Sequence, residues 1–377
     1  MIKVRLARCA IVAVVLWAIS LSAPADNFSQ HPGFATHLAA HPPDSRAVSR
    51  HDKGLLQRYR PRLWVGPDQD GPIGFYRDYI AHGTLYDAGG DPISSDVDQA
   101  LLNRHKQHPG MTFVHAPADR GAQAIVPARV DHARLPCTPE FTFLTYNFVF
   151  HDSGLPAGLA VWKEWPLRLI TDLDDWHQLD HYTAASVVLG PAQKPLALLV
   201  QQHNGQRSYV FGEDIPLPAD GRVELSAALR SNELYPRGRG RHRTVQFMSP
   251  AGLRYLVTGE DKPLFASEDI TEDGREIPYT LEFLLHDDAF YLFQGALGAR
   301  RPLPGRDGPP GALYHTLPMF MNRALQLVAF HWAEGDTRQM RLLLDFTQAS
   351  RAQGRAATDS AAFNQLCAQF MAAITPR

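Results

Sequence analysis

The densest group of side chains suited to chemistry lies between residues 172 and 181, in the segment DLDDWHQLDH. Carboxylates and imidazoles can hold a divalent ion together, because each donates a lone pair and the carboxylates add negative charge. The segment separates two apolar runs, and connecting segments often present functional side chains. The acidic and imidazole residues of this polar cluster are Asp172, Asp174, Asp175, His177, Asp180 and His181.

Two interpretations of the polar cluster remain open. In a helix, His177 and His181 would share one face with Asp180 beside them, a shortened form of the inverted zinc-protease motif H-x-x-E-H. Against this, Asp replaces the longer Glu, and residues 182–189 have the β-favouring composition of a strand. The other interpretation is a solvated acidic turn at the end of a β-structure.

A second polar group is the alternation of arginine with glycine or histidine from residue 237 to residue 243. In an extended strand, Arg237, Arg239, Arg241 and Arg243 would project from one side and form a site for phosphate or sulfate. Because glycine adds backbone freedom, a flexible charged loop is the alternative. Asp68-Gln69-Asp70-Gly71 resembles the start of a calcium loop but lacks the closing Glu, and is interpreted as a turn.

The order of several motifs resembles a known family. The segments are YRPRLWVGPDQDGPIGFYRDYI, DDWHQLDHYTAASVVL, PLALLVQQHNGQRSY and VELSAALRSNELYP. Together they resemble the vacuolar-protein-sorting-associated protein sixty-two family over about residues 59–236. More distantly, they are similar to the necrosis-inducing-protein-like sandwiches. The resemblance implies a β-sandwich with a polar cluster at one end.

The resemblance also implies candidate binding residues. Asp175-Trp176 matches the family's D-W with His177 in the position of its Glu, and residues 202–205 match a Q-H-S/N-G motif. Residues 231–236 match a segment ending in Y-P, with Asn232 in the position of a His. The necrosis-inducing relatives bind a divalent cation near a similar motif. The predicted cation ligands here are Asp175, His177, Asp180 and His203. The predicted ligand-binding residues are Trp176, Asn204, Asn232, Glu233, Tyr235, Arg237 and Arg239.

The first 25 residues have the pattern of a secretory signal peptide. Lys3, Arg5 and Arg8 precede an apolar run from residue 9 to residue 21, which small residues follow. A helix of this run would span about 20 Å, less than the roughly 30 Å hydrocarbon core. We therefore expect a periplasmic or secreted protein. An uncleaved N-terminal anchor is the alternative.

The cysteine count fits such a compartment. Of three cysteines, Cys9 falls in the targeting segment, which leaves Cys137 and Cys367. An oxidising compartment permits a disulfide between them. Two buried thiols are the alternative, because free cysteine is commonly buried.

The rest of the sequence predicts a mainly β fold, a β-sandwich core with peripheral α-helices that include a C-terminal helix. Short runs of β-favouring residues separated by turn signals support this class. We expect a signal peptide over 1–25, a linker over 26–47, a sandwich domain over 48–299 and a helical C-terminal segment over 300–377. Helices are expected from Ser49 to before Pro61, over 95–105, 319–332 and 359–374. Strands are expected over 62–65, 111–115, 141–150, 159–169, 183–189, 196–202, 207–211, 223–229, 244–248 and 253–258, with a further strand pair over 279–293.

Composition and motifs together favour a binding function. The net charge of −2 argues against a protein that coats nucleic acid, and the hydrolase, metalloprotease and nucleotide-binding signatures G-x-S-x-G, H-E-x-x-H and G-x-x-x-x-G-K-[ST] are absent from the sequence. We therefore expect a cell-envelope protein that binds a polar or anionic small molecule, glycan or lipid head group, aided by a divalent cation. A metal-dependent hydrolase and an inert interaction protein are the alternatives.

Overall fold

The computed structural model describes most of the chain between residues 45 and 315. The described residues are 45, 47–115, 123–134, 140–151, 182–190, 193–202, 205–212, 215–237, 270–271, 273–298, 308 and 310–315. The predicted signal peptide, both predicted C-terminal helices, and the strands expected over 159–169, 244–248 and 253–258 lie outside these ranges. Within them, no helix combines the length and apolar character needed to cross a membrane.

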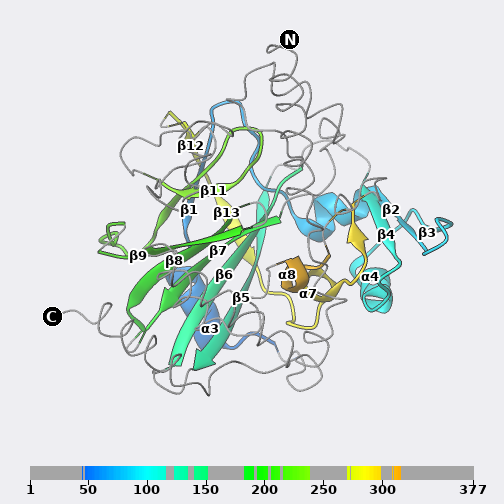
Figure 1. Cartoon of the computed structure of the whole chain (residues 1–377), viewed down its shortest axis with the longest axis horizontal. Helices are drawn as coiled ribbons and strands as arrows, with labels where there is room; N and C mark the ends of the chain where they lie inside the picture. Colours follow the sequence, from blue (N-terminus) through cyan, green and yellow to red (C-terminus); the bar gives the residue numbers. More distant parts are fainter. Residues whose placement is uncertain are drawn as a thin grey trace, which may run out of the picture.

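Two β-sheets dominate the molecule (Figure 1). The larger sheet has six strands in the order β13-β5-β6-β7-β8-β9 and the smaller has four in the order β11-β10-β1-β12. The strands of the larger sheet are β5 (Ala124–Arg134), β6 (Glu140–Val149), β7 (Tyr182–Leu189), β8 (Pro195–Gln202), β9 (Gly205–Val210) and β13 (Tyr279–Glu282). Those of the smaller sheet are β1 (Arg62–Val65), β10 (Glu224–Ala227), β11 (Leu234–Pro236) and β12 (Arg275–Ile277).

The two sheets pack face to face around one apolar core. Leu63 of β1 and Leu225 of β10 meet Leu144 and Tyr146 of β6 and Val187 of β7 in a single buried cluster. Successive side chains of a strand point to opposite faces, so each strand contributes alternate residues to this core. The predicted mainly β fold with a sandwich core is therefore confirmed.

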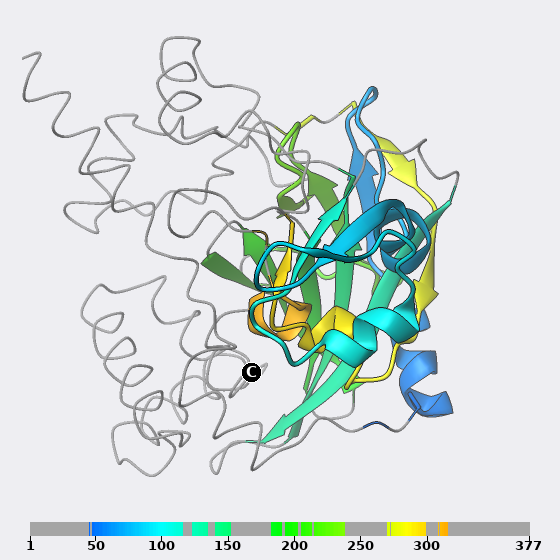
Figure 2. The same ribbon diagram turned by 90° about the vertical axis from the view of Figure 1, so that its right-hand side faces the viewer.

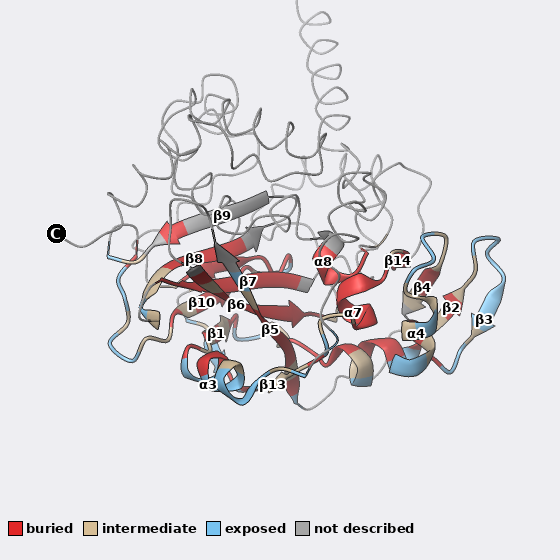
Figure 3. Cartoon of the chain, turned by 90° about the horizontal axis from the view of Figure 1, so that it is seen from below, coloured by how far each residue is buried: buried red, intermediate tan, exposed pale blue. Residues whose placement is uncertain are grey.

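The aromatic strand β6 is buried on both faces. Tyr146 and Phe148 belong to the core between the sheets, whereas Phe141 and Phe143 lie on the opposite face and are fully buried as well. Figure 3 shows β5 to β8 mainly in the colour of buried residues. A strand that is covered on both faces accepts aromatic residues at odd and even positions alike, which explains its continuous apolar sequence.

A smaller lobe lies beside the sandwich and has its own core. Its sheet has the order β14-β4-β2-β3, and its buried cluster includes Phe75, Phe113 and Phe290. Figure 2 shows this lobe in cyan, yellow and orange. Its elements are η2 (Phe75–Tyr79), η3 (Ile80–His82), β2 (Gly83–Tyr86), β3 (Pro92–Ser94), α4 (Gln99–His105), β4 (Thr112–His115), α7 (Ala289–Leu292), β14 (Ala296–Leu297) and α8 (Ala312–His315).

The first predicted helix is confirmed, and the second begins later than expected. Helix α3 (Arg50–Arg58) starts after Ser49, whose hydroxyl accepts a hydrogen bond from the backbone N–H of Asp52. Helix α4 begins at Gln99 rather than Ser95, because the Asp98 carboxylate caps it by accepting from the N–H of Leu101 at 2.7 Å.

The expectation of a strand pair over 279–293 is half wrong. Residues 279–282 form strand β13, but residues 289–292 form the helical turn α7. The Asp288 carboxylate caps this turn by accepting from the N–H of Phe290 at 2.8 Å. All four residues of α7 are buried, so the sequence shows an apolar run without the polar positions that would distinguish a helix from a strand.

Candidate functional site

All four predicted cation ligands lie outside the described residues. This holds for Asp175, His177, Asp180 and His203, and also for Trp176, Asn204 and Arg239. Within the described part of the chain, no group of three His, Cys, Asp or Glu residues is arranged to hold a metal ion.

The structure does describe the strands that adjoin the predicted cation site in sequence. Strand β7 begins at Tyr182, directly after the polar cluster in sequence, and Tyr182 pairs with Val149 at the end of β6. Strand β8 ends at Gln202, directly before His203, and runs antiparallel to β7. The start of β7 and the end of β8 therefore lie at the same end of the six-stranded sheet.

A pocket opens at this end of the sandwich. Strands β1 and β10 are parallel, so the loops that follow them, 66–71 and 228–233, emerge at the same edge. A β-bridge between Ile73 and Val149 joins the segment after the first loop to the end of β6. The loops and the end of β6 enclose a cavity of about 450 Å³. This volume falls within the range of about 300–1,000 Å³ that is typical of small-molecule sites.

The pocket combines an apolar base with polar groups of both charges. Phe150 and Leu229 supply the larger apolar side chains. The charged and hydrogen-bonding groups come from three separate segments of the chain, and include Asp68, Asp70, His151, Arg230 and Asn232. Carboxylates, a guanidinium, an imidazole and an amide can together orient a small molecule that carries several hydrogen-bonding groups.

Gln69 joins the two pocket loops. Its side-chain NH₂ donates to the backbone oxygen of Ala228 at 2.8 Å and to Oδ1 of Asn232 at 2.6 Å. Its Oε1 accepts from the N–H of Gly66 at 3.0 Å, and Arg275 donates to its backbone oxygen at 3.0 Å. Both ends of the amide are used within the protein. Gln69 therefore positions the pocket walls, and it also fixes which way the Asn232 amide points.

The second pocket loop holds two residues in the left-handed backbone region. Arg230 has a φ of 70° and Asn232 a φ of 63°. This conformation is costly for residues other than glycine, and asparagine tolerates it best. Two backbone hydrogen bonds hold the loop, from Asn232 N–H to Ala228 oxygen and from Ala228 N–H to Glu233 oxygen. Strained backbone of this kind is concentrated at binding and active sites.

Asn232 allows a direct test of this strain. Asn232→Ala removes the bond to Gln69 and places a residue with a Cβ but no compensating polar group in the left-handed region, so we expect a loss of about 2 kcal/mol in the free energy of unfolding. Asn232→Gly removes the same bond without the strain and should lose about half as much. Urea denaturation measures both. If glycine were as damaging as alanine, backbone strain at this position would be refuted.

Three other described residues from the predicted ligand-binding set, Glu233, Tyr235 and Arg237, are not part of the pocket lining. Tyr235 is buried beside Ala228 and Ile270, and Glu233 is 1% exposed. Arg237 lies on the outer face of the four-stranded sheet, where its guanidinium carbon is 3.8 Å from the centre of the Trp64 ring. Its Nε is 4.0 Å from the Glu224 carboxylate. Of the described residues that the sequence nominated, Asn232 is the one that lines the pocket.

Sequence reasoning missed Asp68, Asp70, His151 and Arg230 as pocket residues. The sequence predicts a turn over 68–71, and the place of this turn in a pocket depends on the loop after β10, which is about 160 residues away in the chain. The combination of Gly, Pro and Asp in 66–71 and the Arg, Ser and Asn of 230–232 signal two turns. It does not signal that they meet.

Comparisons with known proteins give limited similarity. No family model matches the chain, and no curated protein matches it. Two solved structures of NLPPya, one in complex with mannosamine and one with glucosamine, are similar to it. The first is 13% identical and covers 52% of this chain and 70% of its own, with a TM-score of 0.26. The second is 12% identical and covers 52% of this chain and 71% of its own, also with a TM-score of 0.26. The resemblance to the vacuolar-sorting family remains a prediction.

Proposed function

We propose that this chain is an exported cell-envelope β-sandwich protein that binds a small polar ligand in the pocket between the 66–71 and 228–233 loops. The observation that carries the proposal is the pocket itself, a cavity of about 450 Å³ with an apolar base and polar groups from three segments. The two residues of one wall in the left-handed backbone region add to it, because such strain is concentrated at binding and active sites.

The balance of charge in the pocket indicates the kind of ligand. Asp68 and Asp70 carry negative charge, and Arg230 carries positive charge. A strongly anionic ligand would meet two carboxylates, whereas a neutral or zwitterionic molecule with hydroxyl or amino groups can use both signs. The pocket therefore favours a polar ligand over an anionic one. Export rests on the first 25 residues of the sequence.

A thermal-shift screen tests the proposal. A panel of neutral sugars, amino sugars, polyols and amino acids is added to the mature protein. A ligand that binds only the folded state at 100 times its Kd stabilises that state by about 2.7 kcal/mol, so we expect at least one member to raise Tm by a few degrees. The Asp68→Asn, Asp70→Asn double variant should lose most of this rise.

Asp273→Asn is the matched control, because Asp273 is exposed and does not line the pocket. Its Tm rise should equal that of the unmodified protein. If no panel member stabilises the protein, or if the double variant responds as the control does, the pocket is not the binding site. Repeating the screen with Ca²⁺, Mg²⁺, Mn²⁺ or Zn²⁺ and with EDTA tests the cation predicted at Asp175, His177, Asp180 and His203.

A further inference from the structure

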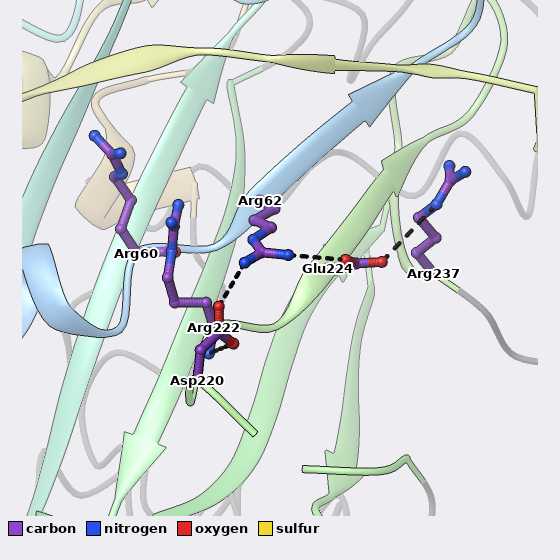
Figure 4. Close-up of polar contacts among 6 residues, drawn as sticks. All are labelled: Arg60, Arg62, Asp220, Arg222, Glu224 and Arg237. Atoms are coloured by element: carbon purple, nitrogen blue, oxygen red, sulfur yellow. Dashed lines mark hydrogen bonds and ion pairs between the residues drawn. The ribbon is translucent and has the colours of Figure 1, made fainter. Parts of the chain in front are cut away.

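A pair of arginines lies at the opposite end of the four-stranded sheet from the pocket. Arg60 precedes β1 by two residues, and Arg222 precedes β10 by two residues. Because β1 and β10 are parallel, with Arg62 opposite Glu224, the segments that lead into them lie side by side. Figure 4 shows both side chains together with Arg62, Asp220, Glu224 and Arg237.

Neutral groups hold the two guanidiniums in place. Arg60 donates from one terminal nitrogen to the backbone oxygen of Tyr279 at 2.9 Å, and its guanidinium carbon lies 5.3 Å from the centre of the Tyr279 ring. Arg222 donates from Nε to the backbone oxygen of Arg60 at 2.8 Å. The second contact joins the two arginines directly, and neither contact neutralises a charge.

The carboxylates of this cluster are used by the other two arginines. Arg62 forms ion pairs with Asp220 at 2.6 Å and with Glu224 at 3.4 Å, and Glu224 also faces Arg237. Among the described residues, no carboxylate forms an ion pair with Arg60 or Arg222. The six residues of Figure 4 comprise four guanidiniums and two carboxylates, which leaves an excess of two positive charges.

The charges of both arginines act on Tyr279. Burial raises the pKa of the Tyr279 hydroxyl, and the positive charges of Arg60 and Arg222 oppose this rise by favouring the phenolate. The negative charge of Glu276 raises the pKa by a smaller amount. The hydroxyl donates to the backbone oxygen of Pro61 at 2.5 Å, which fixes the ring against which Arg60 lies. The Arg60 guanidinium therefore lies on a fixed ring, and Arg222 is tied to the backbone of Arg60.

We propose that Arg60 and Arg222 form a binding site for a phosphate monoester group, separate from the pocket. Each guanidinium is planar and presents its N–H groups as a fork that matches the spacing of phosphate oxygens. A phosphate monoester carries a charge of about −1.5 to −2 at pH 7, which matches the two guanidiniums. The site goes beyond the proposed function, because it requires neither the pocket nor a metal ion.

Calorimetric titration with inorganic phosphate, at constant ionic strength maintained with chloride, tests the site. We expect saturable binding to the unmodified protein, and an increase in Kd of about tenfold for either Arg60→Gln or Arg222→Gln. Arg222→Lys keeps the charge but loses the fork, so its Kd should rise less than that of Arg222→Gln. Because Arg60→Gln also removes a bond to Tyr279, the Arg222 variants keep the test valid if that variant unfolds.

Arg58→Gln is the matched control. Arg58 is an exposed arginine near the end of α3 that lies over Tyr59, and its removal should change Kd less than twofold. Two results would overturn the proposal, either the absence of saturable phosphate binding or an equal loss of affinity in Arg58→Gln.

Vesicles identify the source of the phosphate group. Phosphatidylcholine vesicles that contain phosphatidic acid present a phosphate monoester on a lipid, and vesicles that contain phosphatidylserine present the same sign of charge without one. If the protein sediments only with phosphatidic acid vesicles, and the Arg60 and Arg222 variants do not, the phosphate group belongs to a lipid head group. Phosphate binding without sedimentation assigns a soluble phosphate ester. Equal sedimentation with both anionic lipids in every variant, without binding of inorganic phosphate, contradicts the site.

Discussion

Replacing Asp288 by alanine is expected to lower the free energy of unfolding by about 4 kcal/mol, since several buried donors would lose a charged acceptor together. Asp288 is 5% exposed. Its carboxylate accepts from the Tyr76 hydroxyl, from Gln99 Nε2 at 2.8 Å and from Asn103 Nδ2 at 3.1 Å. It also caps α7 through the N–H of Phe290. One side chain thus joins η2, α4 and α7.

The state of Tyr76 supports this expectation. Burial raises the pKa of the Tyr76 hydroxyl well above its usual value, and the negative charge of Asp288 raises it further. The hydroxyl therefore remains protonated and donates to the carboxylate at physiological pH. Tyr76→Phe removes one of the four donors and should cost about 1–2 kcal/mol.

Urea denaturation measures the effect of Asp288→Ala, with Asp287→Ala as the matched control. Asp287 is the neighbouring carboxylate and is less buried. The short contact at Asp287 joins Lys106 to its backbone oxygen rather than to its side chain. The control should therefore lie within about 0.5 kcal/mol of the unmodified protein. A loss below 1 kcal/mol in Asp288→Ala would show that the smaller lobe does not depend on this carboxylate.

The sequence predicts the strands of the sandwich where local patterns are strong. β1, β6 and β7 contain several aromatic and β-branched residues, and β8 contains a short apolar run rich in leucine. All four form within two residues of the expected limits. All four contribute residues to the core between the sheets.

Strand β5 is absent from the sequence prediction for a physical reason. It contains Pro127, Arg129 and Asp131, and proline and charged residues argue against a buried strand. The structure satisfies these charges internally, because Arg129 pairs with Asp131 and its guanidinium lies 5.0 Å from the centre of the Tyr291 ring. This compensation involves a residue 162 positions away, so no local pattern reports it.

The candidate pocket depends on the same kind of distant contact. Its two loops meet because β1 and β10 pair in parallel, although 158 residues lie between the end of β1 and the start of β10. The sequence identifies turn residues in each loop, but parallel pairing has no local signal. The paired arginines of the proposed phosphate site depend on the same strand pair, so the sequence does not show that they lie together either. A residue such as Asn232 could be nominated, whereas its partner Gln69 could not.

Phe148→Ala is expected to lower the free energy of unfolding by about 3–5 kcal/mol, the usual range for truncating a buried phenylalanine. Phe148 is fully buried in the core between the sheets. Its ring meets that of Tyr279 edge to face, with centroids 5.4 Å apart and an interplanar angle of 81°. Truncation would leave a cavity between β6 and β13 and remove this aromatic contact.

Phe283→Ala is the matched control for the core, because Phe283 packs against the same cluster but is only partly buried. Since less apolar surface leaves the interior, we expect it to cost about 1–2 kcal/mol, measured by urea denaturation alongside Phe148→Ala. Residues of both sheets form one buried cluster, so burial between the sheets should stabilise the molecule. A loss in Phe148→Ala no larger than that in Phe283→Ala would contradict this packing. The same result would contradict the rigid base that Tyr279 is inferred to provide for Arg60.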